Sequence, residues 1–101
     1  MKRLKLKAQE RRGHILEAAL QVAQETGWRK MTREDIADAA GVACGLVGQY
    51  FGGMEALRSA VMKEAVHRGI LPVVAEGLAL RHSAALAASP ALKRKAANSL
   101  S

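Results

Sequence analysis

The sequence predicts an all-α fold, with a three-helix helix-turn-helix domain followed by a fourth and a fifth helix. Apolar residues recur at the three- and four-residue spacing of amphipathic helices, and no segment alternates as a half-buried strand would. Glycine or proline stands at the expected helix ends. The 101 residues suffice for one small domain with a mainly aliphatic core, because phenylalanine, tyrosine and tryptophan occur once each. This size excludes a large enzyme with a deep substrate cavity.

The first helix is expected from Arg12 to about Glu25, and Gly27 ends it because glycine accepts left-handed backbone angles. Trp28 is expected to pack against this helix. Residues 1–10 are expected to form a basic, flexible arm before it, and whether the end of the arm joins the helix is left open. The apolar positions of the helix lie at helical spacing: Ile15, Leu16, Ala19, Val22 and Ala23.

Two short helices are expected next. Thr32 opens the first of them, because its hydroxyl can accept a free N–H and Asp35 stands three residues further on, as in a capping box. Gly41 ends this helix, and the other is expected over residues 43–50, with Phe51 and either Leu46 or Val47 buried. Two short helices joined by a glycine turn, over about residues 32–51, have the anatomy of a helix-turn-helix. The second helix of such a pair can enter the major groove of DNA.

The fourth helix is expected from Met54 to Arg68, within a helix-turn-helix domain of residues 11–69. Pro72 suits the first turn of a fifth helix, which is expected to run as one element through residues 70–89. This segment is more apolar than its length requires, and it is predicted to form a dimer interface. Pro90 is expected to end the fifth helix, and residues 90–101 are predicted to be a basic, disordered tail.

Charge is concentrated at the two ends of the chain, whose formal net charge is +7. Residues 1–12 carry six basic side chains and one acidic one, and residues 90–101 carry three basic side chains and no acidic one. Residues 13–89 carry seven basic and eight acidic side chains. Basic ends on a near-neutral body favour a polyanionic partner, either nucleic acid or an anionic membrane. The alternative is that the tails only keep the protein soluble. A membrane partner is not expected, because the apolar anchors of residues 1–10 are limited to Met1, Leu4 and Leu6.

Cysteine and hydropathy point to a cytoplasmic protein. Cys44 is the only cysteine, so no disulfide can form within the chain and a reducing compartment is favoured. No signal peptide is visible at the N-terminus, and the most apolar segment, residues 69–80, is too short and too polar to span a bilayer. Neither a metal site nor a cofactor is expected, since the histidines lie far apart: His14, His67 and His82.

Catalysis is not expected either. Three carboxylates lie close together on one early helix without a histidine or metal-ligand partner in register: Glu34, Asp35 and Asp38. The glycines of residues 45–53 lack the strand-turn-helix context of a phosphate-binding loop.

Four successive motifs, RGHILEAALQVAQETG, TREDIADAAGV, GLVGQYF and EALRSAV, resemble the DNA-binding domain of the tetracycline-repressor (TetR) family of transcriptional regulators. The resemblance covers about Arg12 to Val61. It implies a three-helix DNA-reading unit, a fourth helix that leads onward, and a two-fold dimer on a near-palindromic operator in double-stranded DNA.

The sequence departs from the family in two respects. Family members usually carry a second, larger helical domain that binds a small effector, and only a short stretch follows the fourth helix here, so no effector is expected. Dimerisation would then rest on the fourth helix and residues 70–88. The reading helix also differs, since Ala43 replaces a serine cap, Gly48 a phosphate-binding tyrosine, and Met54 a lysine with the same role.

The resemblance leaves eight residues able to reach DNA: Thr32, Arg33, Ala43, Cys44, Gly45, Leu46, Gln49 and Tyr50. Gln49 could bond an adenine edge or a phosphate, and Leu46 could meet a thymine methyl group. Arg33 and Tyr50 are expected to hold phosphates. For Gln49 and Arg33, plain solvation without a DNA role stays open. The arm is predicted to enter the minor groove with four side chains: Lys2, Arg3, Lys5 and Lys7.

The sequence therefore predicts a sequence-specific DNA-binding transcriptional regulator, a small dimeric repressor without an effector-binding domain. The alternative is an interaction module that heterodimerises with a larger regulator and modulates its DNA binding. Cys44 begins the reading helix, where a helix N-terminus can lower a thiol pKa, so a redox switch is a further hypothesis. Its alternative is a small residue that faces DNA or solvent.

Overall fold

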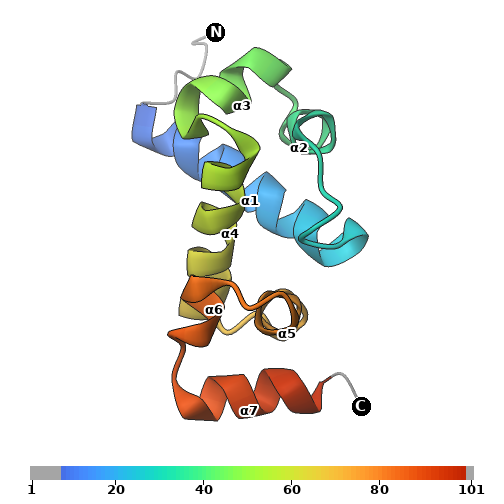
Figure 1. Cartoon of the computed structure of the whole chain (residues 1–101). Coiled ribbons are helices and arrows are strands. Elements are labelled where there is room, and N and C mark those ends of the chain that lie inside the picture. The colour runs from blue at the N-terminus through green and yellow to red at the C-terminus, as the bar shows by residue number, and fades with distance from the viewer. Residues whose placement is uncertain (1–7, 100–101) are drawn as a thin grey trace, which may run out of the picture.

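The computed structural model describes residues 8–99, which form helices and no strands. The molecule is elongated, 49 × 22 × 20 Å, and α4 runs from a first lobe of α1–α3 to a second lobe of α5–α7 (Figure 1). The all-α prediction is confirmed. The helices are α1 (Ala8–Thr26), α2 (Arg33–Ala40), α3 (Cys44–Phe51), α4 (Met54–Arg68), α5 (Leu71–Ala79), α6 (Ser83–Leu86) and α7 (Pro90–Asn98).

Local signals set the helix ends of the first lobe. Thr32 accepts the N–H of Asp35 and the Asp35 carboxylate accepts the N–H of Thr32, so the capping box is complete. Gly41 ends α2 in the left-handed region, with φ 70° and ψ 35°. The helix α1 begins at Ala8, earlier than the expected Arg12, so the end of the predicted arm, residues 8–10, belongs to the helix. Alanine, glutamine and glutamate favour helix there, and Glu10 complements the positive helix end.

The core of the first lobe comes from the predicted apolar faces together with α4. Leu57 and Val61 of α4 are buried along with residues of the first three helices: Ile15, Leu20, Met31, Ile36 and Val47. His14 donates a hydrogen bond from Nε2 to the Ala40 carbonyl oxygen at 2.7 Å, which joins α1 to the end of α2. The pair α2 and α3 is thereby held on a packed support.

The single fifth helix predicted over residues 70–89 is wrong, because the chain reverses after Ala79. Arg81 has a positive φ of 57°, and His82 then caps α6 by accepting the N–H of Ala84 on Nδ1 at 3.1 Å. The reversal places α6 against α4 and α5 and buries Ala85 completely. A continuous helix would carry this apolar residue away from the core, so tertiary burial overrides helical periodicity here.

The disordered tail predicted for residues 90–101 is wrong for Pro90–Asn98, which form α7. Ser89 caps the helix by accepting the N–H of Leu92 at 3.2 Å, and Pro90 occupies the first turn, where its missing N–H costs nothing. Ala96 is fully buried. Pro90 thus begins a helix that packs on α5, rather than ending the chain's ordered part.

The two lobes are joined at the connector between α1 and α2. The Glu76 carboxylate of α5 accepts the backbone N–H groups of Trp28 at 2.9 Å and Arg29 at 2.7 Å. From α4, Arg58 donates to the carbonyl oxygens of Arg29 and Met31, and its own carbonyl accepts the Trp28 indole N–H at 2.9 Å. Trp28 therefore packs between the lobes and not only on the helix it follows. These contacts also fix where α2 begins.

An exposed ion pair gives the fold a predicted acid sensitivity. Arg68 of α4 bridges Glu17 of α1 and Glu64, and the hydrogen bond from Arg68 lowers the pKa of the Glu17 carboxyl. A carboxylate whose pKa is lower in the folded state adds stability above its unfolded pKa and loses it as the pH falls. We expect the free energy of unfolding to decrease slightly below about pH 4.3, the ordinary value for glutamate.

Chemical denaturation of the wild type and of Glu17→Gln across this pH range would measure that loss. Glu25→Gln, on an exposed residue of the same helix, is the matched control. An acid decrease that is equally large in Glu17→Gln would contradict the assignment to Glu17.

Candidate nucleic-acid interface

The outer face of α3 is the exposed surface of the helix-turn-helix. Val47 and Phe51 point into the core, whereas Gly45 and Gln49 lie one turn apart on the exposed side. Ala43, the N-cap of α3, is also exposed and makes no side-chain cap hydrogen bond. The structure thus brings Ala43, Gly45 and Gln49 together on a face that a DNA groove can approach.

Two of the predicted reading residues are less accessible. Cys44 and Leu46 are half-buried and pack against the hydrophobic core with part of their side chains. The sequence left Leu46 or Val47 open as the buried residue of this helix, and Val47, at 1 % exposure, takes that role. Leu46 and Cys44 therefore border the exposed face rather than forming its centre.

At the N-terminus of α2, two predicted residues lie beside this face. The Thr32 hydroxyl oxygen accepts the Asp35 N–H at 3.1 Å, which leaves the hydroxyl hydrogen free to donate. Arg33 is half-buried, and within residues 8–99 its guanidinium forms no hydrogen bond or ion pair. Its N–H donors are therefore available to a ligand outside the chain.

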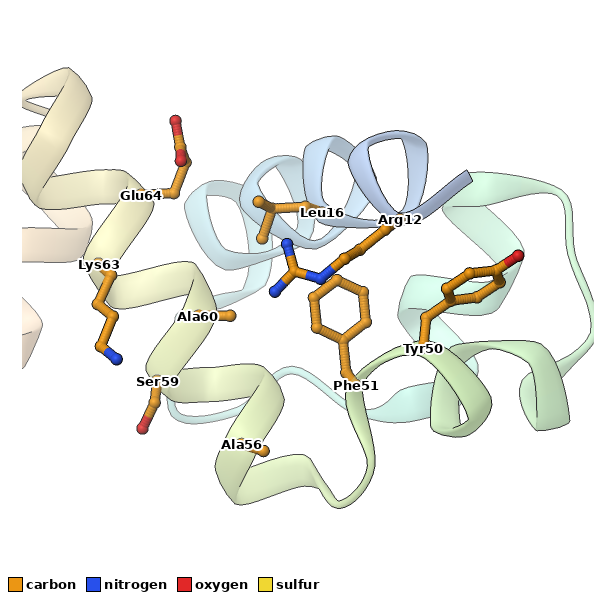
Figure 2. A pocket seen from close by; sticks show the side chains of 9 residues that line it. All are labelled: Arg12, Leu16, Tyr50, Phe51, Ala56, Ser59, Ala60, Lys63 and Glu64. Atoms are coloured by element: carbon orange, nitrogen blue, oxygen red, sulfur yellow. The ribbon is translucent and has the colours of Figure 1, made fainter. Parts of the chain in front are cut away.

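Tyr50, near the end of α3, lies at the edge of a pocket of about 500 Å³ between α1, α3 and α4 (Figure 2). Figure 2 shows its hydroxyl pointing away from α4, at the outer side of the pocket. Beside it, the Arg12 guanidinium carbon lies 4.6 Å from the centre of the Phe51 ring, a cation–π contact that holds α1 against the end of α3.

Arg12 lies next to the reading helix, and the sequence did not predict this contact for it. The sequence predicts Arg12 as the first residue of the first helix, and its helical spacing to Ile15 and Leu16 was the available signal that its side chain lies on the same face as theirs. The predicted arm residues, Lys2, Arg3, Lys5 and Lys7, lie outside the described residues.

No group of three or more histidine, cysteine or acidic residues able to hold a metal occurs in residues 8–99. Of the α2 carboxylates, Asp35 is occupied as a cap acceptor. None of the helices in the described part of the chain is both long and apolar enough to cross a membrane.

The uncapped start of α3 predicts a stabilising substitution. Ala43→Ser introduces a hydroxyl that can accept a free N–H of the first turn, and such a cap adds about 1 kcal/mol. Urea denaturation followed by Trp28 fluorescence would measure the gain. Ala39→Ser, an exposed position inside α2, is the matched control and is expected to lower stability slightly. Equal effects of the two variants would argue against the cap.

Comparison with known proteins agrees with this geometry. The family model of bacterial regulatory proteins, tetR family, matches residues 15–61, which extend from the first buried turn of α1 to the middle of α4. No curated protein and no solved structure is significantly similar to the chain. Residues 15–61 are therefore an N-terminal DNA-binding domain of the tetR family of bacterial regulatory proteins, and the chain carries the DNA-binding unit of a transcription regulator.

Proposed function

We propose that this protein is a repressor that binds a near-palindromic operator as a homodimer and reads its sequence with α3. The observation that carries the proposal is the exposed outer face of α3, held on a packed three-helix unit whose sequence matches the tetR family. A single short helix makes few base contacts, so two copies related by two-fold symmetry give the affinity and the specificity that one lacks.

In this proposal the exposed face of α3 meets the base edges. Gln49 bonds an adenine edge or a phosphate, and Leu46 contacts a thymine methyl group from the border of the face. Ala43, Cys44 and Gly45 have short or absent side chains, which support a close approach of the helix start to the DNA. Base contacts of this kind specify the operator sequence.

Phosphate contacts come from the flanks of α3. Arg33 and Thr32 offer free donors at the start of α2, and the Tyr50 hydroxyl faces outward near the other end of α3. Lys2, Arg3, Lys5 and Lys7 add minor-groove or phosphate contacts from the N-terminal arm. Deleting residues 2–7 is therefore expected to flatten the dependence of affinity on salt. An unchanged affinity and salt slope would remove the arm from the proposal.

The second lobe supports dimerisation through residues 70–89. Two large apolar side chains of this lobe are exposed. They are Leu80, 42 % exposed at the end of α5, and Leu86, 40 % exposed at the end of α6. Both lie in the lobe remote from α3 (Figure 1), so a contact between two copies there leaves both reading helices accessible. Leu80→Glu and Leu86→Glu are expected to shift the protein toward monomer in sedimentation equilibrium and to weaken operator binding.

Selection of bound sequences from a random duplex pool, at two salt concentrations, tests the function directly. Enrichment of a palindrome with half-sites about one helical turn apart is the expected result. A reporter gene placed behind that palindrome then distinguishes repression from activation. Recovery of no motif, with binding that vanishes as salt rises, would contradict sequence-specific regulation.

A further inference from the structure

Arg33 is the only basic side chain in the helix-turn-helix. Residues 32–51 carry three acidic side chains and this single cation, so the reading unit has a formal charge of −2. A phosphate that approaches α2 and α3 therefore meets one favourable charge among several unfavourable ones. The position of the Arg33 guanidinium therefore determines where on α2 and α3 a DNA phosphate is attracted.

The structure places the Arg33 guanidinium directly over Gly48 of α3. A Cβ atom built on Gly48 would lie 3.4 Å from Nη1, 3.6 Å from Cζ and 3.9 Å from Nη2 of Arg33. The cation from the start of α2 therefore reaches across to the middle of α3 and lies against bare backbone. A side chain longer than alanine at position 48 would occupy the same space.

Gly48 requires no unusual backbone angle that would explain the glycine. It lies inside α3 and is not among the glycines with positive φ, where other residues are strained. A glycine inside a helix is otherwise unfavourable compared with alanine. Within residues 8–99, the Arg33 guanidinium is the group that lies over the open side of Gly48, in van der Waals range of where a side chain would begin.

We infer that Gly48 is a positioning residue for DNA binding: its missing side chain forms the seat that holds the Arg33 guanidinium on the reading helix. A guanidinium seated there lies beside the exposed face of α3 and keeps its N–H donors free for a phosphate. The inference deepens the proposed function and depends on it. It also gives the glycine in α3 a role, where the sequence alone indicated only a lost phosphate contact.

A double-mutant cycle tests the inference with Arg33→Ala, Gly48→Leu and the combined variant, each measured on duplex DNA over a range of salt concentrations. Leucine favours helix, so it leaves α3 intact while filling the seat. Each single variant is expected to lower affinity about tenfold, as expected for one charge-assisted contact. Each is also expected to flatten the salt slope by about one unit for each bound protomer. The combined variant is expected to match Arg33→Ala alone, and Arg33→Lys is expected to retain the slope.

Two results would overturn the inference. If Gly48→Leu weakens binding as strongly in the Arg33→Ala background, the leucine blocks DNA directly and the seat is not the cause. If Gly48→Leu leaves the salt slope unchanged, the guanidinium does not depend on position 48 to reach a phosphate. A nuclear Overhauser contact between the Gly48 α-protons and the Arg33 guanidinium protons, measured on the wild type, tests the seat even if a variant fails to fold.

Failure of the proposed function gives a different result. A wild type that selects no operator contradicts sequence-specific regulation, but its salt-dependent binding to any duplex still reports on Arg33 and Gly48. A wild type that selects a palindrome, with a cycle that shows additive effects, contradicts only the inference about Gly48.

Discussion

Replacing Trp28 with alanine is expected to destabilise the protein by about 3–5 kcal/mol, a large part of the stability of a small domain. Trp28 is 6 % exposed, and its indole N–H donates to the Arg58 carbonyl oxygen at 2.9 Å. Its ring also meets the His82 ring edge-on, with centroids 5.3 Å apart. The alanine variant loses all three contributions, because it removes the side chain that fills the space between the two lobes.

Trp28→Phe separates packing from hydrogen bonding. Phenylalanine keeps an aromatic ring in the core but cannot donate to Arg58, so we expect a loss clearly smaller than that of the alanine variant. Circular dichroism during urea denaturation is the suitable measurement, since both variants remove the only tryptophan. A Trp28→Ala variant that unfolds at nearly the wild-type urea concentration would show that the two lobes are not joined through this residue.

Gly77→Ala is expected to destabilise the protein by about 1–2 kcal/mol, although alanine is the better helix former. A Cβ atom at position 77 would lie 2.5 Å from Cε and 2.7 Å from Sδ of Met62, and 2.8 Å from the Cβ of Ala85. The end of Met62 can move, but the Cβ of Ala85 is fixed to the α6 backbone. The helix α6 must therefore shift. Overpacking of this kind costs about 1–3 kcal/mol, which exceeds the gain in helix propensity.

Gly13→Ala is the matched control for this prediction. Gly13 also lies inside a helix, but a Cβ atom there would meet no atom of residues 8–99 within 4 Å. The same chemical change is therefore expected to stabilise the protein, by up to about 1 kcal/mol. Thermal denaturation followed by Trp28 fluorescence can measure both variants. Changes of the same sign in the two would contradict the close approach of α5, α4 and α6 at Gly77.

The reading unit could be predicted well from the sequence because its signals are local. The pair Thr32 and Asp35 caps α2 through atoms three residues apart, and Gly41 and Gly69 end helices through their own backbone angles. Such signals act within one helical turn. The spacing of apolar residues also separates the buried face of α3 from its exposed face, on which Gln49 lies.

The second lobe was predicted less well because its helix ends depend on distant contacts. The His82 cap is local, but the positive φ of Arg81 is tolerated because the turn that follows α5 buries Ala85 against α4 and α5. For the two prolines, only the neighbouring residues were available to predict whether each begins or ends a helix. Pro72 lies in the first turn of α5, as the sequence predicts. Pro90 is expected to end a helix, but it lies in the first turn of α7, after the cap Ser89.

Helix periodicity, caps and glycine turns are properties of neighbouring residues, and they were enough to establish the all-α class and the helix-turn-helix of this protein. The joining of its two lobes by Trp28 and Glu76, and the seating of Arg33 on Gly48, bring together residues between 15 and 48 positions apart. Such pairs form only after the helices pack. Packing depends on which surfaces bury one another in three dimensions, and a periodic pattern along the chain does not specify that choice.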